Sequence, residues 1–299
     1  MNVLCFTQKH SATIPALLAL AILAVVAPVR LCGAEAAINA TAVADSQLAH
    51  AKQQAGDNAP QIERALRDAP GPQRRAMRFL VAHMPPRDLK SLSADYLLDN
   101  VSLAFQARDA APWGQDMPED VFFNDVLPYA SINERRDEWR RDFVGRFSPL
   151  IKDARTPGEA AQILNRDMFK LIDVRYHASK RPKPDQSPYE SIEAGYASCS
   201  GLSVLLIDAC RAVGTPARFV GTKQWAGKRG NHSWVEIWDN GEWKFMGACE
   251  FNKNGLNKTW FQGNASKAIK DDPQHAIYAS SWKQTGTSFP LVWDDSIKY

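Results

Sequence analysis

The sequence predicts an α+β fold, with a helical region in the first half of the chain and a helix followed by an antiparallel sheet in the second. Apolar residues recur at helical spacing up to about residue 172. Residues 232–239 instead alternate between two faces, and Asn240-Gly241 directly after them is a pair typical of a two-residue hairpin turn. The 299 residues are enough for one large domain or two small ones.

The first 34 residues have the pattern of a secretory signal peptide. The basic pair Lys9-His10 precedes an apolar run, Ile14 to Val29, that is shorter than the ~20 residues a membrane span needs. Cys32-Gly33-Ala34 fits a small-x-small cleavage site, with Ala34-Glu35-Ala36 as the alternative. We therefore expect residues 1–34 to be removed and the protein to be secreted or periplasmic. No membrane span would remain, whereas a retained anchor is the competing interpretation.

Charge and composition narrow the partners and the chemistry. The chain has a net charge of +3, and its charges are mixed in sign without a basic stripe interleaved with aromatic residues. This pattern argues against nucleic-acid binding. The sequence contains neither CxxC nor HExxH, so no metal site is expected, and the chemistry proposed below needs no cofactor.

The helical region is expected to span residues 35–177 and to begin with a linker rich in Ala, Gln and Asn at 36–60. Four helix starts follow, and each has a residue suited to that position: Pro72, Ser93, Asn133 and the capping box Thr156-Pro157-Gly158-Glu159. The apolar stripes of these helices are interpreted as core.

Residues 178–299 are expected to form a separate domain. Its first part, 178–195, contains closely spaced prolines and is predicted to be a long surface loop. The elements that follow are a helix at Ser200–Val213 and strands at Ala217–Thr222, His232–Asp239, Glu242–Gly247, Ala276–Ser281 and Phe289–Trp293.

Cys199 and His232 are the candidate catalytic pair. Cys199 directly precedes a helix, where the first-turn amides and the helix dipole stabilise a thiolate. A helix, a strand, and then a strand that opens with His232 is the order that a papain-like thiol–imidazole site requires. The backbone amide of Cys199 would contribute to an oxyanion hole.

Three short motifs resemble the core of transglutaminase-like proteins, a superfamily of papain-like fold. They are Cys199-Ser200-Gly201-Leu202-Ser203, His232-Ser233-Trp234-Val235-Glu236-Ile237-Trp238, and Trp243 with Gly247-Ala248-Cys249-Glu250. Val126-Leu127-Pro128-Tyr129, Asn133-Glu134 and Trp139 are similar to an extension of exported bacterial members. The resemblance implies a papain-like core with a Cys-His-Asp triad, in which Cys199 and His232 fill the first two places.

The third place departs from the family pattern, because the aspartate expected four residues after Trp243 is Gly247. Hairpin register puts positions 247 and 249 on the face of His232, and Glu250 on the other face unless the glycine introduces a bulge. Glu250 is therefore one candidate for the carboxylate that orients His232. A water molecule, a backbone carbonyl or a residue from elsewhere are the alternatives.

Trp225 and Trp234 are predicted to shape the substrate cleft, although Trp234 could equally be packing alone. The mature chain would keep Cys199, Cys210 and Cys249, an odd number. A Cys210–Cys249 bridge, a reversible Cys199–Cys249 bond and three free thiols are all compatible with the sequence.

The function expected from these features is thiol-dependent acyl transfer on amide bonds. Hydrolysis of peptide or isopeptide bonds through a Cys199 thioester is favoured over transfer to an amine. The substrate would be a protein, a peptide or a cell-wall peptide. The competing hypothesis is an inactive binding or structural module that keeps the fold, and the missing aspartate is its main support.

Overall fold

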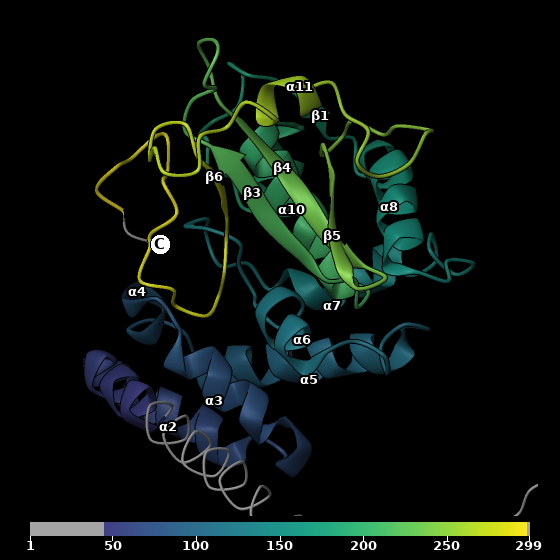
Figure 1. Ribbon diagram of the computed structural model, residues 1–299. Helices are drawn as coiled ribbons and strands as arrows, with labels where there is room; N and C mark the ends of the chain where they lie inside the picture. Colours follow the sequence, from purple (N-terminus) through teal and green to yellow (C-terminus); the bar gives the residue numbers. More distant parts are fainter. Residues whose placement is uncertain (1–44, 298–299) are drawn as a thin grey trace, which may run out of the picture. The chain divides into compact units, whose positions relative to one another are not determined.

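The computed structural model describes residues 45–297 of the chain (Figure 1). The predicted signal peptide lies outside these residues. Gln47 and the described residues after it form one compact unit of helices and an antiparallel sheet, which confirms the predicted α+β class. No helix in the described part of the chain is both long and apolar enough to cross a bilayer.

The first half of this unit is helical, as predicted. Its elements are η1 (Gly56–Asn58), α2 (Ala59–Asp68), η2 (Gly71–Gln73), α3 (Arg74–Ala82), α4 (Pro86–Leu89), α5 (Ala94–Ala110), α6 (Glu119–Asp125), α7 (Trp139–Phe147) and α8 (Pro157–Leu171). Residues 47–54, expected to belong to a linker, are helical as well. Leu48 and Ala51 on this stretch are buried in the apolar cluster formed by α2, α3 and α5, so it belongs to the core.

The second half carries the sheet. Its elements are β1 (Arg175–Tyr176), α9 (Pro188–Ala194), β2 (Tyr196–Ala197), α10 (Cys199–Ala212), β3 (Ala217–Thr222), β4 (His232–Asp239), β5 (Glu242–Met246), α11 (Gln262–Ala265) and β6 (Ile277–Ala279). Residues 289–293, predicted to be a strand, contain turns instead. Their apolar pattern reflects packing, because Phe289 and Leu291 are buried against the main core.

The main sheet has the spatial order β5-β4-β3-β6, and every neighbouring pair is antiparallel. Asn240 and Gly241 join β4 to β5 with φ angles of 54° and 84°, as a two-residue hairpin of the mirror-image type requires. The register pairs Val235 with Met246 and Trp238 with Trp243. Continued by three residues, it would place position 249 opposite His232, but β5 ends at Met246.

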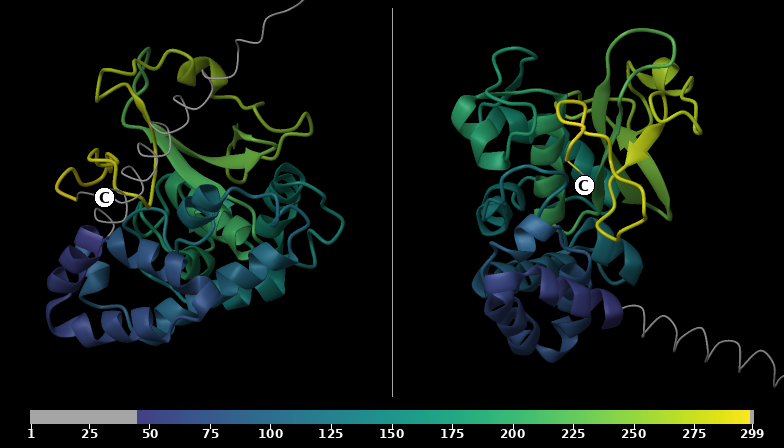
Figure 2. Two further views of the ribbon diagram at one scale, coloured as in Figure 1. Left: turned by 60° about the horizontal axis from the view of Figure 1, so that its bottom comes forward. Right: turned by 90° about the vertical axis from the view of Figure 1, so that its left-hand side faces the viewer.

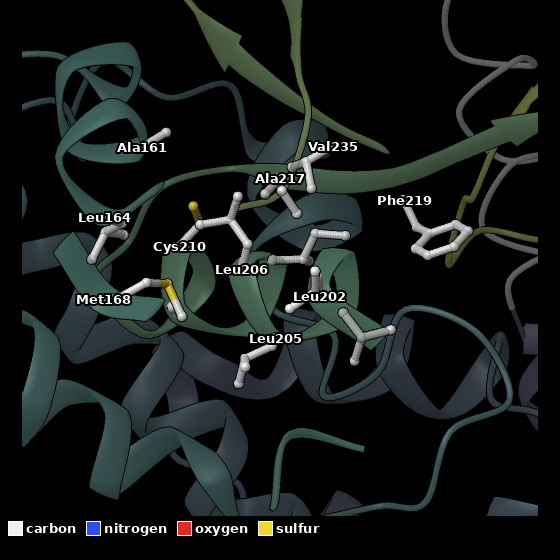
Figure 3. Packing of buried hydrophobic residues seen from close by; sticks show 14 of the residues in the cluster. Ala161, Leu164, Met168, Leu202, Leu205, Leu206, Cys210, Ala217, Phe219 and Val235 are labelled. Carbon is white, nitrogen blue, oxygen red and sulfur yellow. The ribbon is translucent and has the colours of Figure 1, made fainter. Parts of the chain in front are cut away.

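Helix α10 lies against β3 and β4 and is buried along nearly its whole length (Figure 1). Leu202, Leu205 and Leu206 are each at most 1% exposed and share an apolar cluster with Met168 of α8 and Val235 of β4 (Figure 3). Truncation of one such leucine to alanine typically costs about 2–5 kcal/mol. This packing fixes α10, and with it Cys199, relative to β4.

The N-terminal helices reach the sheet through α7 and α10. Further views show α2, α3 and α5 as a layer beside these two helices (Figure 2). Helices α7 and α8, however, share the apolar cluster of α10 and β4. The core around α10 therefore includes helices from before residue 178, while the proposed domain boundary there stays a prediction.

Two predicted helix caps are confirmed and one is wrong. The hydroxyls of Ser93 and Thr156 each accept a hydrogen bond of 3.1 Å from the amide three residues later. Asn133 caps no helix, because α7 begins only at Trp139, and the Asn133 side chain instead donates to Asp185 at 2.8 Å.

Helix α9 corrects the prediction of an uninterrupted loop at 178–195. Ser187 accepts a hydrogen bond from the amide of Glu190, and the Glu190 carboxylate accepts one from the amide of Ser187 at 2.8 Å. With Pro188 as the first helical residue, this is a complete capping box. The signal was present in the sequence, but the prolines just before it favoured a loop.

Two buried arginines tie the segment 125–130 to α10. Arg140 of α7 donates to three consecutive carbonyls of this segment at 3.0–3.2 Å. Arg211 of α10 donates to two others at 3.1 and 2.8 Å, and the Trp139 indole donates to the carbonyl of Tyr129 at 3.0 Å. The motif that resembled an extension of exported proteins is therefore structural, since it joins the helical layer to α10.

Candidate active site

One cleft brings together the three predicted catalytic residues. Cys199, His232 and Glu250 all line it, and its volume is about 560 Å³. Cys199 is the first residue of α10, His232 the first of β4, and Glu250 follows β5. The Ser198 side chain caps no amide of α10, because its hydroxyl donates to the carbonyl of Pro184 at 3.5 Å. The first-turn amides thus keep no N-cap acceptor and can stabilise negative charge that develops beside Cys199.

His232 is enclosed by aromatic rings. Its side chain is 8% exposed, and the ring centroids of Trp260 and Phe261 lie 5.0 and 4.8 Å from its own. Burial lowers the pKa of His232 to about 4, so the imidazole is neutral at pH 7 and able to accept a proton. Its Nε2 has no hydrogen-bond partner among the described residues, and the nearest carboxylate oxygen is Oε1 of Glu250, 3.9 Å away. Nε2 is therefore the ring nitrogen that faces Glu250.

A turn after β5 brings Glu250 to His232. The amide of Glu250 donates to the carbonyl of Gly247 at 3.3 Å, and Cys249 has a left-handed φ of 62°. The strand alternation therefore stops before Glu250, whose side chain would otherwise point away from His232. From the sequence, Glu250 could reach the face of His232 only through a bulge at Gly247. In the structure, the turn at residues 247–250 brings it there instead.

Glu250 fills the space that a side chain at position 247 would occupy. A Cβ built on Gly247 would overlap the Glu250 carboxylate group and would lie 2.7 Å from its Cδ and 3.0 Å from its Cβ. A side chain at 247 and the present conformation of Glu250 therefore exclude each other. The carboxylate that is missing at position 247 is present in the same space, on a side chain three residues later.

Trp260 orients the carboxylate of Glu250. Its Nε1 donates to Oε2 at 2.8 Å, which leaves Oε1 toward His232. Burial raises the pKa of Glu250, and the hydrogen bond from Trp260 opposes that rise. Trp260 is 60% exposed, so the carboxylate lies close to the mouth of the cleft.

Asn165 of α8 forms hydrogen bonds with the turn at residues 247–250. Its Nδ2 donates to the carbonyl of Gly247 at 2.9 Å, and its Oδ1 accepts from the amide of Cys249 at 2.7 Å. Asn165 is buried, and both ends of its amide are satisfied by backbone groups of one turn. Its contacts fix the backbone that directs Glu250 toward His232.

The expected position of Trp225 and Trp234 in the substrate cleft needs correction. Both indoles are buried, at 4% and 3% exposure, and neither lines the cleft. Their rings are nearly parallel, 7° apart in orientation, and they form an apolar cluster with Val220 and Phe261 beside His232. Strand alternation does place Trp234 on the face of His232, but Phe261 covers it there.

The three described cysteines are free thiols, which corresponds to one of the three alternatives left open by the sequence. Cys210 is buried in the core, and burial raises its pKa. Cys249 is half-buried against the same core, and burial raises its pKa as well. Of the three, only Cys199 lines the cleft.

The rest of the cleft wall comes from segments that carry no sequence signal of function. Tyr176 and Arg181 lie on and just after β1, Trp260 on the loop before α11, and Trp293 near the end of the described chain. These residues lie on irregular or very short elements, so no periodic pattern could have placed them beside Cys199.

Residues 147–248 match the family model of the transglutaminase-like superfamily. The matched segment is about a third of the chain, runs from α8 through β5, and is similar to the core of that superfamily, as the sequence motifs indicated. The match includes Cys199 and His232 and ends two residues before Glu250.

One solved structure that matches is a candidate cysteine protease from Cytophaga hutchinsonii, 20% identical to this chain, with a TM-score of 0.36. The alignment covers 56% of this chain and 54% of that one, so the match spans about half of each protein. No curated protein matches the sequence.

Proposed function

We propose that this protein catalyses thiol-dependent acyl transfer on amide bonds, as a hydrolase of peptide or isopeptide bonds. The observation that carries the proposal is the convergence of Cys199, His232 and Glu250 on one cleft, with the Glu250 carboxylate in the space of the missing aspartate. The transglutaminase-like core that holds Cys199 and His232 supports this reaction class.

The proposed reaction uses these three side chains in sequence. His232 accepts the thiol proton of Cys199 as the sulfur attacks the amide carbon, and the first-turn amides of α10 stabilise the oxyanion. The intermediate collapses to a thioester as the amine leaves with the proton from His232. A water molecule then attacks the thioester, His232 accepts its proton, and the carboxylic acid leaves as Cys199 regains its hydrogen.

Glu250 would orient the imidazole and stabilise its protonated form between these steps. Its Oε1 is 3.9 Å from Nε2 of His232, slightly beyond hydrogen-bond reach, a gap common in sites without substrate. The buried, neutral His232 gains most from this carboxylate when it becomes charged, because opposite charges interact strongly where water is excluded.

The substrate we propose is a protein, a peptide or a cell-wall peptide. Water is the acyl acceptor we favour over an amine, since it is always present. The signal-like segment at residues 1–34 supports a secreted or periplasmic location, where such substrates occur.

A non-catalytic binding module is the second candidate. The observation that favours it is Nε2 of His232, which is buried without a hydrogen-bond partner among the described residues. In that case the cleft would bind a peptide without cleaving it.

Screening the mature protein against cell-wall peptides and denatured proteins, with Cys199→Ser and His232→Asn as controls, separates these candidates. Release of new amino groups by the wild type alone supports hydrolysis. Peptide binding without any release, equal in the wild type and Cys199→Ser, would establish the binding module instead. We also expect the sulfur of Cys199 and a ring nitrogen of His232 to lie within ~4 Å in a crystal structure.

A further inference from the structure

The charge on the cleft wall comes from two residues apart from the thiol and the imidazole. Among residues 45–297, Arg181 is the only lysine or arginine that lines the cleft, and Glu250 is the only carboxylate. Glu250 already has two neighbours, His232 and Trp260. Arg181 has no hydrogen bond or ion pair with any described residue, although its side chain is partly buried.

The guanidinium of Arg181 also has a buried donor without an acceptor. Its Nε is inaccessible to water and has no hydrogen-bond partner in the described part of the chain. A buried donor left unpaired destabilises the folded state, and more so where it is charged. The two arginines of the core show the contrast, because Arg140 and Arg211 each donate to several carbonyls.

A second unpaired donor lines the same cleft. Nε1 of Trp293 is likewise buried and has no acceptor among residues 45–297, and Trp293 is more than a hundred residues from Arg181 in sequence. These two N–H groups are covered by the protein, whereas the terminal nitrogens of Arg181 are not among the buried unpaired atoms and stay open to a ligand in the cleft. A carboxylate matches the planar fork of an arginine.

Arg181 lies in the electrostatic neighbourhood of the nucleophile. The pKa of Tyr176 is raised mainly by burial and further by Cys199 and Glu250, whereas Arg181 opposes the rise. All of these side chains line the cleft. Arg181 and Cys199 line one cleft, so a substrate bound at Cys199 can place a carboxylate at Arg181.

We propose that Arg181 is a specificity-determining residue that binds a carboxylate of the peptide substrate. The inference rests on the proposed function, because it names the substrate class of the same cleft. The carboxylate is either an aspartate or glutamate side chain next to the scissile amide or the C-terminal carboxylate of a short peptide.

A matched pair of small thiol reagents tests the inference without a known substrate. Iodoacetate carries a carboxylate and iodoacetamide does not. The rate of Cys199 alkylation by iodoacetate divided by the rate with iodoacetamide therefore reports a carboxylate-binding site nearby. We expect Arg181→Gln to lower this ratio by about tenfold or more, the effect of one charged hydrogen bond. Arg181→Lys, which keeps the charge without the fork, should give an intermediate ratio.

Arg229→Gln is the matched control. Arg229 is exposed, does not line the cleft, and its replacement changes the net charge by the same amount. A ratio unchanged by Arg181→Gln, or lowered equally by Arg229→Gln, would overturn the proposal. If Cys199 reacts slowly with both reagents, the proposed catalytic function fails, and peptide binding then tests Arg181 by itself.

To measure peptide binding, Cys199→Ser protein is titrated calorimetrically with three N-acetylated peptides: Ac-Gly-Glu-Gly-NH₂, Ac-Gly-Gly-Gly-OH and Ac-Gly-Gln-Gly-NH₂. One of the two carboxylate peptides should bind about tenfold more tightly than the neutral peptide, and Arg181→Gln should abolish the difference. The first peptide would identify a side-chain carboxylate and the second a C-terminal one. Equal affinity for all three would refute the inference.

Discussion

Moving the carboxylate from position 250 to position 247 tests whether the two positions share one space. The variants are Gly247→Asp and Glu250→Gly, made singly and together. In the single variant Gly247→Asp, the new Cβ would lie 2.7 Å from Cδ of Glu250, so Glu250 must leave its place. Overpacking of this kind costs about 1–3 kcal/mol, and two carboxylates in one space repel each other as well.

Glu250→Gly alone removes the carboxylate that faces His232. Loss or neutralisation of the acid in such triads lowers turnover by about 10²- to 10⁴-fold. In the double variant, glycine at 250 removes every Glu250 atom that a Cβ at 247 would meet, including the Cβ at 3.0 Å. Gly247 does not have a positive φ, so an aspartate can adopt its backbone conformation.

We therefore expect the double variant to be at least about tenfold more active than Glu250→Gly, a difference of about 1.4 kcal/mol in transition-state stabilisation. The assay is kcat/KM on the best peptide from the substrate screen, with melting temperatures measured in parallel. A double variant that folds as well as Glu250→Gly but is no more active would refute the shared space. Wild-type turnover in Glu250→Gly would move the orienting role to another group.

Three further predictions follow from the surroundings of the site. Trp260→Phe removes the hydrogen-bond donor that lowers the pKa of Glu250. The acid limb of the pH dependence of kcat/KM should therefore move to higher pH, and an unmoved limb would argue against an ionised Glu250. Burial lowers the pKa of His232 from 6.5 to about 4, so between these pH values the unfolded chain binds more protons than the folded one. The free energy of unfolding should therefore fall as the pH drops from 6.5 toward 4. Urea unfolding of His232→Gln should show a smaller fall, and an identical one would contradict this origin. Asn165→Ala removes two hydrogen bonds to the 247–249 turn and should cost about 1–3 kcal/mol of stability together with a loss of kcat. Asn165→Asp keeps the acceptor for Cys249 but turns a carboxylate oxygen toward the buried Gly247 carbonyl, so it should be no more stable than Asn165→Ala. A destabilised Asn165→Ala with normal kcat would show that the turn does not direct Glu250.

The sequence predicted the parts of the fold that depend on local patterns. The start of α10 at Cys199 and the hairpin at Asn240-Gly241 were both predicted within one residue, because caps, turns and apolar periodicity lie close together along the chain. Helix α9 was missed although its capping box was visible, since neighbouring prolines outweighed a four-residue signal.

The site was harder to predict than its framework. The direction of Glu250 depends on the backbone of Cys249 and on Asn165, which is 84 residues away in sequence. Arg181 and Trp260 reach the cleft from loops, and their placement depends on the packing of other elements. Trp234 was assigned to the cleft from strand alternation alone, which gives the face of the sheet but not what covers it.

The central claim, that Cys199 and His232 form a reactive pair, is tested most directly by alkylation of the native protein with iodoacetamide at pH 6, followed by peptide mapping. The chain supplies its own references, because Cys210 is buried, Cys249 is half-buried, and burial raises the pKa of both thiols. The site described above predicts that Cys199 is labelled at least about tenfold faster than Cys249 and that His232→Gln removes most of this advantage. Equal labelling of Cys199 and Cys249, or fast labelling of Cys199 that does not depend on His232, would contradict it.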